Sequence, residues 1–134
     1  MRILIGVASL FLGATGAYAA PSCQGSLDLL QVSDWSISPI DEDTNSLSVT
    51  LSNSGDNAIR MIDGSVAFQD ALGGHIASYS IDRDAQIEAH GSFEETGRWG
   101  PYTFERLLKL KADEVEAYAC VRAVLFADGS KEEF

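Results

Sequence analysis

The sequence of 134 residues contains little positive charge: nine lysines and arginines stand against 20 aspartates and glutamates, which gives a formal net charge of −11. Nucleic acids and anionic membrane surfaces repel such a chain, because every approach to a phosphate group is opposed rather than steered. The charge therefore excludes nucleic-acid binding. It also predicts that a partner selected by charge is cationic: a basic protein, a polyamine or a divalent cation.

Cysteine and histidine are also scarce, with two of each in the chain. The separation of His75 and His90 has none of the spacings that zinc ligands adopt. The sequence contains no Gly-x-Ser-x-Gly motif, and neighbouring acids such as Glu94 and Glu95 point to opposite faces of a strand. We therefore expect no enzyme activity and no cofactor.

The only long apolar run lies at the N-terminus. After Arg2, residues 3–16 are uncharged, and Ala17-Tyr18-Ala19 supplies the small residues that a signal peptidase recognises. We predict a signal peptide at residues 1–19 and one mature domain at residues 20–134, located in the periplasm or secreted. Without Arg2 the mature domain has a formal charge of −12. No second stretch approaches the roughly 20 apolar residues that cross a bilayer, so we expect no membrane span.

The two cysteines, Cys23 and Cys120, lie near the two ends of the predicted mature domain. In an oxidising compartment two thiols that meet usually pair, which predicts a Cys23–Cys120 disulfide. Lipidation of Cys23 is disfavoured, because Ala20 stands where a lipoprotein signal normally has leucine.

Apolar alternation predicts several short strands. Leu47, Val49 and Leu51 alternate with small polar residues and form the clearest half-buried strand. The alternation slips between Val32 and Trp35, which is typical of a β-bulge. The other strand regions are 27–40, 59–69, 76–81, 93–96 and 115–127.

Turn residues separate these strands. Residues 53–57 read Asn-Ser-Gly-Asp-Asn, which predicts a turn that begins a hairpin. Residues 97–101 contain two glycines and a proline, which predicts a break in the strand pattern. Phe104, Leu107 and Leu108 have the spacing of one helical turn or two.

The segment 115–127 is apolar at nearly every position, which predicts a strand in the middle of a sheet. Its large residues are expected on the face that holds Cys120. Short strands, polar turns, at most one short helix and one disulfide together predict an all-β fold: a single immunoglobulin-like antiparallel β-sandwich.

Residues 47–96 resemble a recurring module of exported bacterial proteins, the FxLYD-type and related immunoglobulin-like domains. In that module a strand ends in an Asn-x-Gly or Asn-x-x-Asp turn, and a second strand carries Val-x-Phe-x-Asp-x-x-Gly, which residues 66–73 match. His90 departs from the pattern, since the module usually has proline there. The resemblance implies a non-enzymatic binding or accessory module of the cell envelope.

The most suggestive cluster of side chains is Arg98, Trp99 and Tyr102, because exposed Arg, Trp and Tyr anchor many binding interfaces. The segment 97–104 is therefore a candidate binding edge. The alternative is that Trp99 and Tyr102 close the end of the core.

A weak calcium candidate consists of Asp41, Asp43 and Asn45, which occupy the first three ligand positions of a calcium loop. Ser46 and Ser52 stand where that loop needs its glycine and its bidentate glutamate, so an EF-hand is excluded.

The sequence thus predicts an exported, non-enzymatic β-sandwich that binds a protein partner or serves as an accessory module. One alternative is an acidic inhibitor of a basic secreted enzyme, steered to its target by charge. Another is a protein whose binding depends on weakly held calcium.

Overall fold

The alternating segments form seven strands in the computed structural model, which describes residues 21–134. The predicted signal peptide at residues 1–19 lies outside the described residues. The strands are β1 (Leu30–Pro39), β2 (Asn45–Asn53), β3 (Ile59–Asp70), β4 (His75–Ser80), β5 (Ser92–Trp99), β6 (Val115–Phe126) and β7 (Lys131–Glu133).

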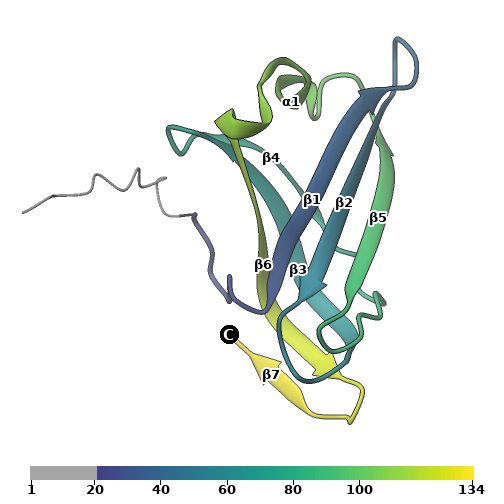
Figure 1. The fold of residues 1–134 in the computed structure, drawn as a ribbon, viewed down its shortest axis with the longest axis vertical. Helices are drawn as coiled ribbons and strands as arrows, with labels where there is room; N and C mark the ends of the chain where they lie inside the picture. The colour runs from purple at the N-terminus through teal and green to yellow at the C-terminus, as the bar shows by residue number, and fades with distance from the viewer. Residues whose placement is uncertain (1–20) are drawn as a thin grey trace, which may run out of the picture.

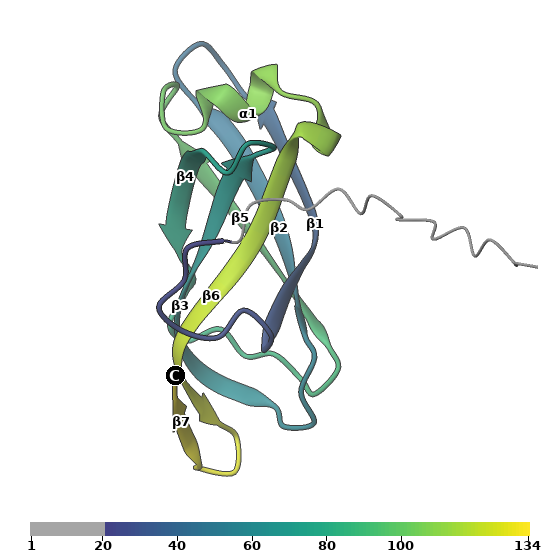
Figure 2. The same ribbon diagram turned by 90° about the vertical axis from the view of Figure 1, so that its left-hand side faces the viewer.

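The strands form two antiparallel sheets that pack face to face (Figures 1 and 2). One sheet has the order β1-β2-β5 and the other the order β4-β3-β6-β7. The pairs β1–β2, β3–β4 and β6–β7 each stay within one sheet, and the chain crosses to the other sheet after β2, after β4 and after β5. The predicted immunoglobulin-like sandwich is confirmed.

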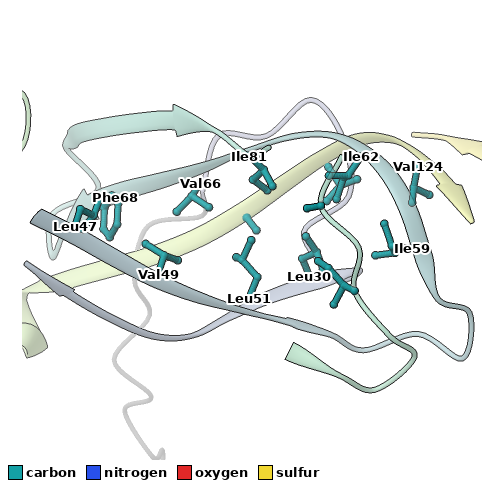
Figure 3. Packing of buried hydrophobic residues seen from close by; sticks show 14 of the residues in the cluster. Leu30, Leu47, Val49, Leu51, Ile59, Ile62, Val66, Phe68, Ile81 and Val124 are labelled. Carbon is teal, nitrogen blue, oxygen red and sulfur yellow. The ribbon is translucent and has the colours of Figure 1, made fainter. Parts of the chain in front are cut away.

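The core lies between the sheets and follows the alternation of the strands (Figure 3). From β2, Leu47, Val49 and Leu51 are at most 2 % exposed, and they face Val66 and Phe68 of β3, which are fully buried. Burial of large aliphatic side chains stabilises the fold by about 1.5–3 kcal/mol for each. The half-buried strand predicted from Leu47, Val49 and Leu51 is confirmed.

The irregularity predicted in the first strand is a β-bulge. The register of β1 against β2 shifts between Val32 and Asp34, which leaves Ser33 as the extra residue. Trp35 then returns to the core and packs edge-on against Phe68, with the ring centroids 5.4 Å apart. The bulge thus keeps the apolar residues before and after it on the inner face.

The hairpin predicted after residues 53–57 is wrong. The turn is present, but β2 belongs to one sheet and β3 to the other, so the connection crosses between layers. Both edges of β2 are occupied, by β1 and by β5. Local turn residues predict that the chain reverses, and they carry no information about which sheet it joins.

Strand β6 lies inside its sheet, but the predicted face of its large residues is wrong. The register of β6 against β3 shifts between Val121 and Ala123. The buried residues of β6 are Val115, Ala119 and Val121 on the N-terminal side of this shift, and Val124 and Phe126 on its C-terminal side. The shift places two residues of β6 opposite Gly64, so Arg122 is the extra residue of a second bulge. Cys120 is therefore on the outer face.

The predicted break at residues 97–101 is also wrong at its start, because β5 continues to Trp99 and pairs with β2 as far as Asn45. Gly97 is tolerated here because β5 is an edge strand and the ring of Trp99, the next inward-facing residue, lies over Gly97. A Cβ on Gly97 would lie 3.0 Å from Trp99 Nε1. Gly97 therefore leaves room for the Trp99 ring.

The predicted helical turn is the five-residue helix α1 (Glu105–Lys109), followed by the 3₁₀ helix η1 (Ala112–Glu114). Phe104 and Leu107 are buried against the core, as their spacing indicates, whereas Leu108 is 40 % exposed. Neither helix, nor any other in residues 21–134, is long and apolar enough to cross a membrane.

The predicted disulfide between Cys23 and Cys120 is confirmed, with the two Cα atoms 5.7 Å apart. The N-terminal segment that it holds also pairs with β6, because Ser26 and Val121 exchange two backbone hydrogen bonds of 2.8 and 2.9 Å. A Cβ on Gly25 would collide with the carbonyl oxygen of Val121. Only glycine permits this close approach.

Candidate binding site at the loop end of the sandwich

The structure separates the three residues of the predicted binding edge. Trp99 is half-buried, and its ring centroid lies 5.2 Å from that of Phe104 and 6.0 Å from that of Tyr79. Trp99 thus closes the end of the core, which is the alternative that the sequence allowed. Tyr102 is 83 % exposed and Arg98 is also exposed, so neither shares this role.

Three connections lie at the end of the sandwich that carries α1, and Figure 1 shows the β1–β2 turn and the β3–β4 turn on opposite sides of this helix (Figures 1 and 2). They are the β1–β2 turn (40–44), the β3–β4 turn (71–74) and the segment from β5 to β6 (100–114), and we call this surface the loop end. The strand directions place them together, because Asn45 pairs with Trp99 and Asp70 pairs with Val115.

The loop end carries most of the exposed apolar side chains. Within residues 21–134, five large hydrophobic residues are exposed, and four of them lie on the loop end. These four are Ile40 (47 %), Leu72 (93 %), Tyr102 (83 %) and Leu108 (40 %). Single exposed apolar residues are ordinary, and these four are set apart only by their position on the same end of the sandwich.

The turn that carries Leu72 is held by Asp70. One carboxylate oxygen of Asp70 accepts hydrogen bonds from the backbone N–H of Leu72 (3.0 Å) and of Gly74 (2.8 Å). The other accepts a hydrogen bond of 2.7 Å from Arg106 Nη1 of α1. These contacts hold the pKa of Asp70 below its ordinary value, and the hydrogen bond from Arg106 contributes most. The apolar tip is therefore presented on an ordered turn.

Charged residues surround the apolar tips. Three of the eight basic residues in the described chain lie on the loop end, and Arg98 lies beside it in β5; the three are Arg106, Lys109 and Lys111. Asp41, Glu42 and Asp43 lie on the neighbouring β1–β2 turn. Apolar anchors with a charged rim are the usual anatomy of a protein–protein interface.

The structure does not bring the calcium candidates together. Asp41 and Asp43 are exposed, and Asp41 Oδ1 accepts the backbone N–H of Asp43 at 2.8 Å within the turn. Asn45 is only 4 % exposed, in the core-facing phase of β2. Residues 21–134 contain no group of three or more His, Cys, Asp or Glu side chains arranged to hold a metal ion.

Sequence reasoning missed a polar pair on the flank between β4 and β5. Tyr79 Oη and Glu95 Oε2 are inaccessible to solvent and have no hydrogen-bond partner among the described residues. Burial and then the charge of Glu95 raise the pKa of Tyr79 well above its ordinary value. Tyr79 and Glu95, together with Trp99, line a hollow of about 220 Å³. No motif indicated this pair, because the two residues meet only through packing of the sheets.

No family model matches the chain, and no curated protein matches it. The resemblance to FxLYD-type domains therefore stays a prediction. Among solved structures, the chain is similar to the Northeast Structural Genomics Consortium target SoR45. The TM-score is 0.40 and the identity 15 %, over 79 % of this chain and 80 % of that one. A likeness of this degree carries no argument about function.

Proposed function

We propose that this protein is an exported, non-enzymatic accessory domain that binds a protein partner through the loop end. The observation that carries the proposal is the gathering of Ile40, Leu72, Tyr102 and Leu108 on one end of the sandwich. Loops presented by a rigid scaffold commonly carry the binding function of a domain.

The β3–β4 turn supports this proposal in a second way. Leu72 is 93 % exposed, yet its turn is ordered by Asp70 and tied to α1 through Arg106. A side chain held in its bound position loses less conformational entropy on association, which strengthens binding. Leu72 and Tyr102 are the side chains we expect to contribute most to the binding energy.

Site-specific photo-cross-linking in the exporting cell tests the proposal. A photoreactive residue with a large apolar side chain replaces Leu72 in one variant, so that the apolar contact is kept, and replaces Asp128 in a control, because Asp128 is exposed on the turn at the opposite end. We expect one discrete adduct from position 72 and none from position 128.

The adduct should disappear when Tyr102 and Leu108 are both replaced by serine. These exposed substitutions leave the melting temperature nearly unchanged. Equal cross-linking from positions 72 and 128, or an adduct that survives the double substitution, would contradict binding at the loop end.

A second candidate is inhibition of a basic secreted enzyme, which the ordered, protruding turn of Leu72 favours. Inhibitors that bind tightly present preorganised loops, and opposite net charge accelerates their association. Such an inhibitor would lose association rate as salt increases, and Leu72→Ala would raise its dissociation rate. An association rate that is indifferent to salt speaks against this candidate.

A further inference from the structure

The hollow lined by Tyr79, Glu95 and Trp99 lies on the flank of the sandwich, where β4 and β5 are each the edge strand of their own sheet. The rings of Trp99 and Tyr79 form two of its walls, with their centroids 6.0 Å apart. Its volume of about 220 Å³ is below the range of about 300–1,000 Å³ that is typical of pockets for drug-sized ligands. The hollow therefore has room for one small group, such as the end of a single side chain.

Both charged residues that line the hollow are acidic. Glu95 shares the inward-facing phase of β5 with Trp99, and Asp82 follows β4. Oε1 of Glu95 accepts the backbone N–H of Asp82 at 2.8 Å, which fixes the carboxylate beside the hollow. Within residues 21–134, neither acid forms an ion pair with a lysine, arginine or histidine. The negative charge at the hollow is thus unbalanced by the described chain.

The carboxylate of Glu95 is also partly shielded from water, because its Oε2 is inaccessible to solvent and without a hydrogen-bond partner among the described residues. Tyr79 does not balance this charge, since burial and then the charge of Glu95 raise the pKa of Tyr79 and keep the phenol uncharged at neutral pH. A sheltered carboxylate without a cation destabilises a fold. A cation in the hollow offsets this cost without touching Oε2, because Coulomb attraction acts over several ångströms and is stronger away from water.

We propose that this hollow binds a primary alkylammonium group, as carried by a lysine side chain or by a polyamine. The ammonium is attracted by the carboxylates of Glu95 and Asp82, and it lies with its methylene groups against the ring of Trp99. Indole is the aromatic ring that attracts a cation most strongly. A divalent metal ion is disfavoured as the occupant, because it takes about six or more oxygen ligands and two walls of the hollow are aromatic.

The probes for this site are Nα-acetyl-lysine methylamide and spermidine, each titrated into the full mature protein. Binding is followed by NMR at the indole N–H of Trp99, and that of Trp35 is the internal reference, since Trp35 does not line the hollow. We expect a saturable shift of the Trp99 signal alone. The uncharged norleucine derivative should leave both signals unchanged. Tighter binding of the lysine derivative than of spermidine identifies a protein side chain as the ligand, and the reverse order identifies a free polyamine.

Glu95→Gln removes the charge with little change of shape. The glutamine oxygen still accepts the backbone N–H of Asp82, so the fold is retained. Affinity for the lysine derivative should fall by about tenfold or more. Glu94→Gln is the matched control, because it removes the same charge from the neighbouring residue, which is exposed on the outer face of β5. This control should change the affinity by less than about twofold.

Three results would overturn the proposal. The first is an equal loss of affinity in Glu94→Gln and Glu95→Gln, which would show attraction by net charge alone. The second is an equal shift of the Trp99 signal with the norleucine derivative, which would show an apolar contact without a role for the cation. The third is the absence of a saturable shift with either probe. If Glu95→Gln then aggregates, the inward-facing charge serves to protect the edge of β5 from pairing with another chain.

Discussion

Arg106 of α1 donates a hydrogen bond of 2.7 Å to Asp70, the residue that ends β3. The side chain of Asp70 is 16 % exposed and that of Arg106 is 52 % exposed. This pair joins the helix that follows β5 to the turn that presents Leu72. Two of the three connections of the loop end are thereby linked through one carboxylate.

The first prediction concerns the pH dependence of this pair. Contacts in the folded state, chiefly with Arg106, lower the pKa of Asp70. Because the folded-state pKa is below the unfolded-state value, the stabilisation is complete above the unfolded-state pKa. It is lost as the pH falls through the folded-state pKa. Asp70→Asn should therefore lower the melting temperature at neutral pH, and its difference from the wild type should shrink in acid.

Melting curves recorded from neutral pH down to about pH 2 test this, since carboxyl groups titrate in the lower part of that range. Asp43→Asn serves as the control, because Asp43 is an exposed acid on the neighbouring turn. A difference between wild type and Asp70→Asn that stays constant down to the lowest pH would refute the role assigned to Asp70.

The second prediction concerns the disulfide. Cys23 and Cys120 are separated by 97 positions, and a cross-link across so long a loop stabilises by about 4–5 kcal/mol in the chain-entropy model. Replacing both cysteines by serine should lower the free energy of unfolding by up to about this amount, measured by urea denaturation. The oxidised protein should show no free thiol after denaturation. Labelling of both cysteines without reductant would exclude the bond.

The third prediction separates the two aromatic residues that the sequence grouped together. Trp99 packs against Phe104 and Tyr79, so Trp99→Ala should destabilise the fold by about 3 kcal/mol. Tyr102 is 83 % exposed, and Tyr102→Ala should change stability by less than about 0.5 kcal/mol. Chemical denaturation of both variants decides the matter. A neutral Trp99→Ala would show that this ring does not close the core.

The fourth prediction concerns Asn53, a polar residue that is only 2 % exposed. Its Nδ2 donates to the carbonyl oxygens of Asn57 (2.9 Å) and Glu88 (3.2 Å), and its Oδ1 accepts the N–H of Gly55 (2.9 Å). Asn53→Ala leaves these groups without their partner and should cost about 2–3 kcal/mol.

Asn57→Ala is the matched control for this prediction, because Asn57 is exposed and contributes only its backbone oxygen to the contact. Denaturant midpoints of the two variants are compared with that of the wild type. Equal midpoints for Asn53→Ala and Asn57→Ala would mean that the buried amide does not hold the crossing between the sheets.

The sequence by itself determined where most strands lie and where the first one bulges. Leu47, Val49 and Leu51 alternate with polar residues because one face of their strand is buried. The alternation slips between Val32 and Trp35 because the strand contains an extra residue there. The helical turn at Phe104 and the pairing of Cys23 with Cys120 were predicted for equally simple reasons: one from spacing, the other from the number of thiols.

Only the tertiary structure decided which strands share a sheet and which side chains meet. The crossing after Asn53, the bulge at Arg122 and the continuation of β5 to Trp99 depend on pairing between distant segments. The same holds for the ion pair of Asp70 with Arg106. Periodicity reports whether a side chain is buried. The identity of its neighbour is fixed only when the two sheets pack, because the edges that pair lie far apart in the sequence.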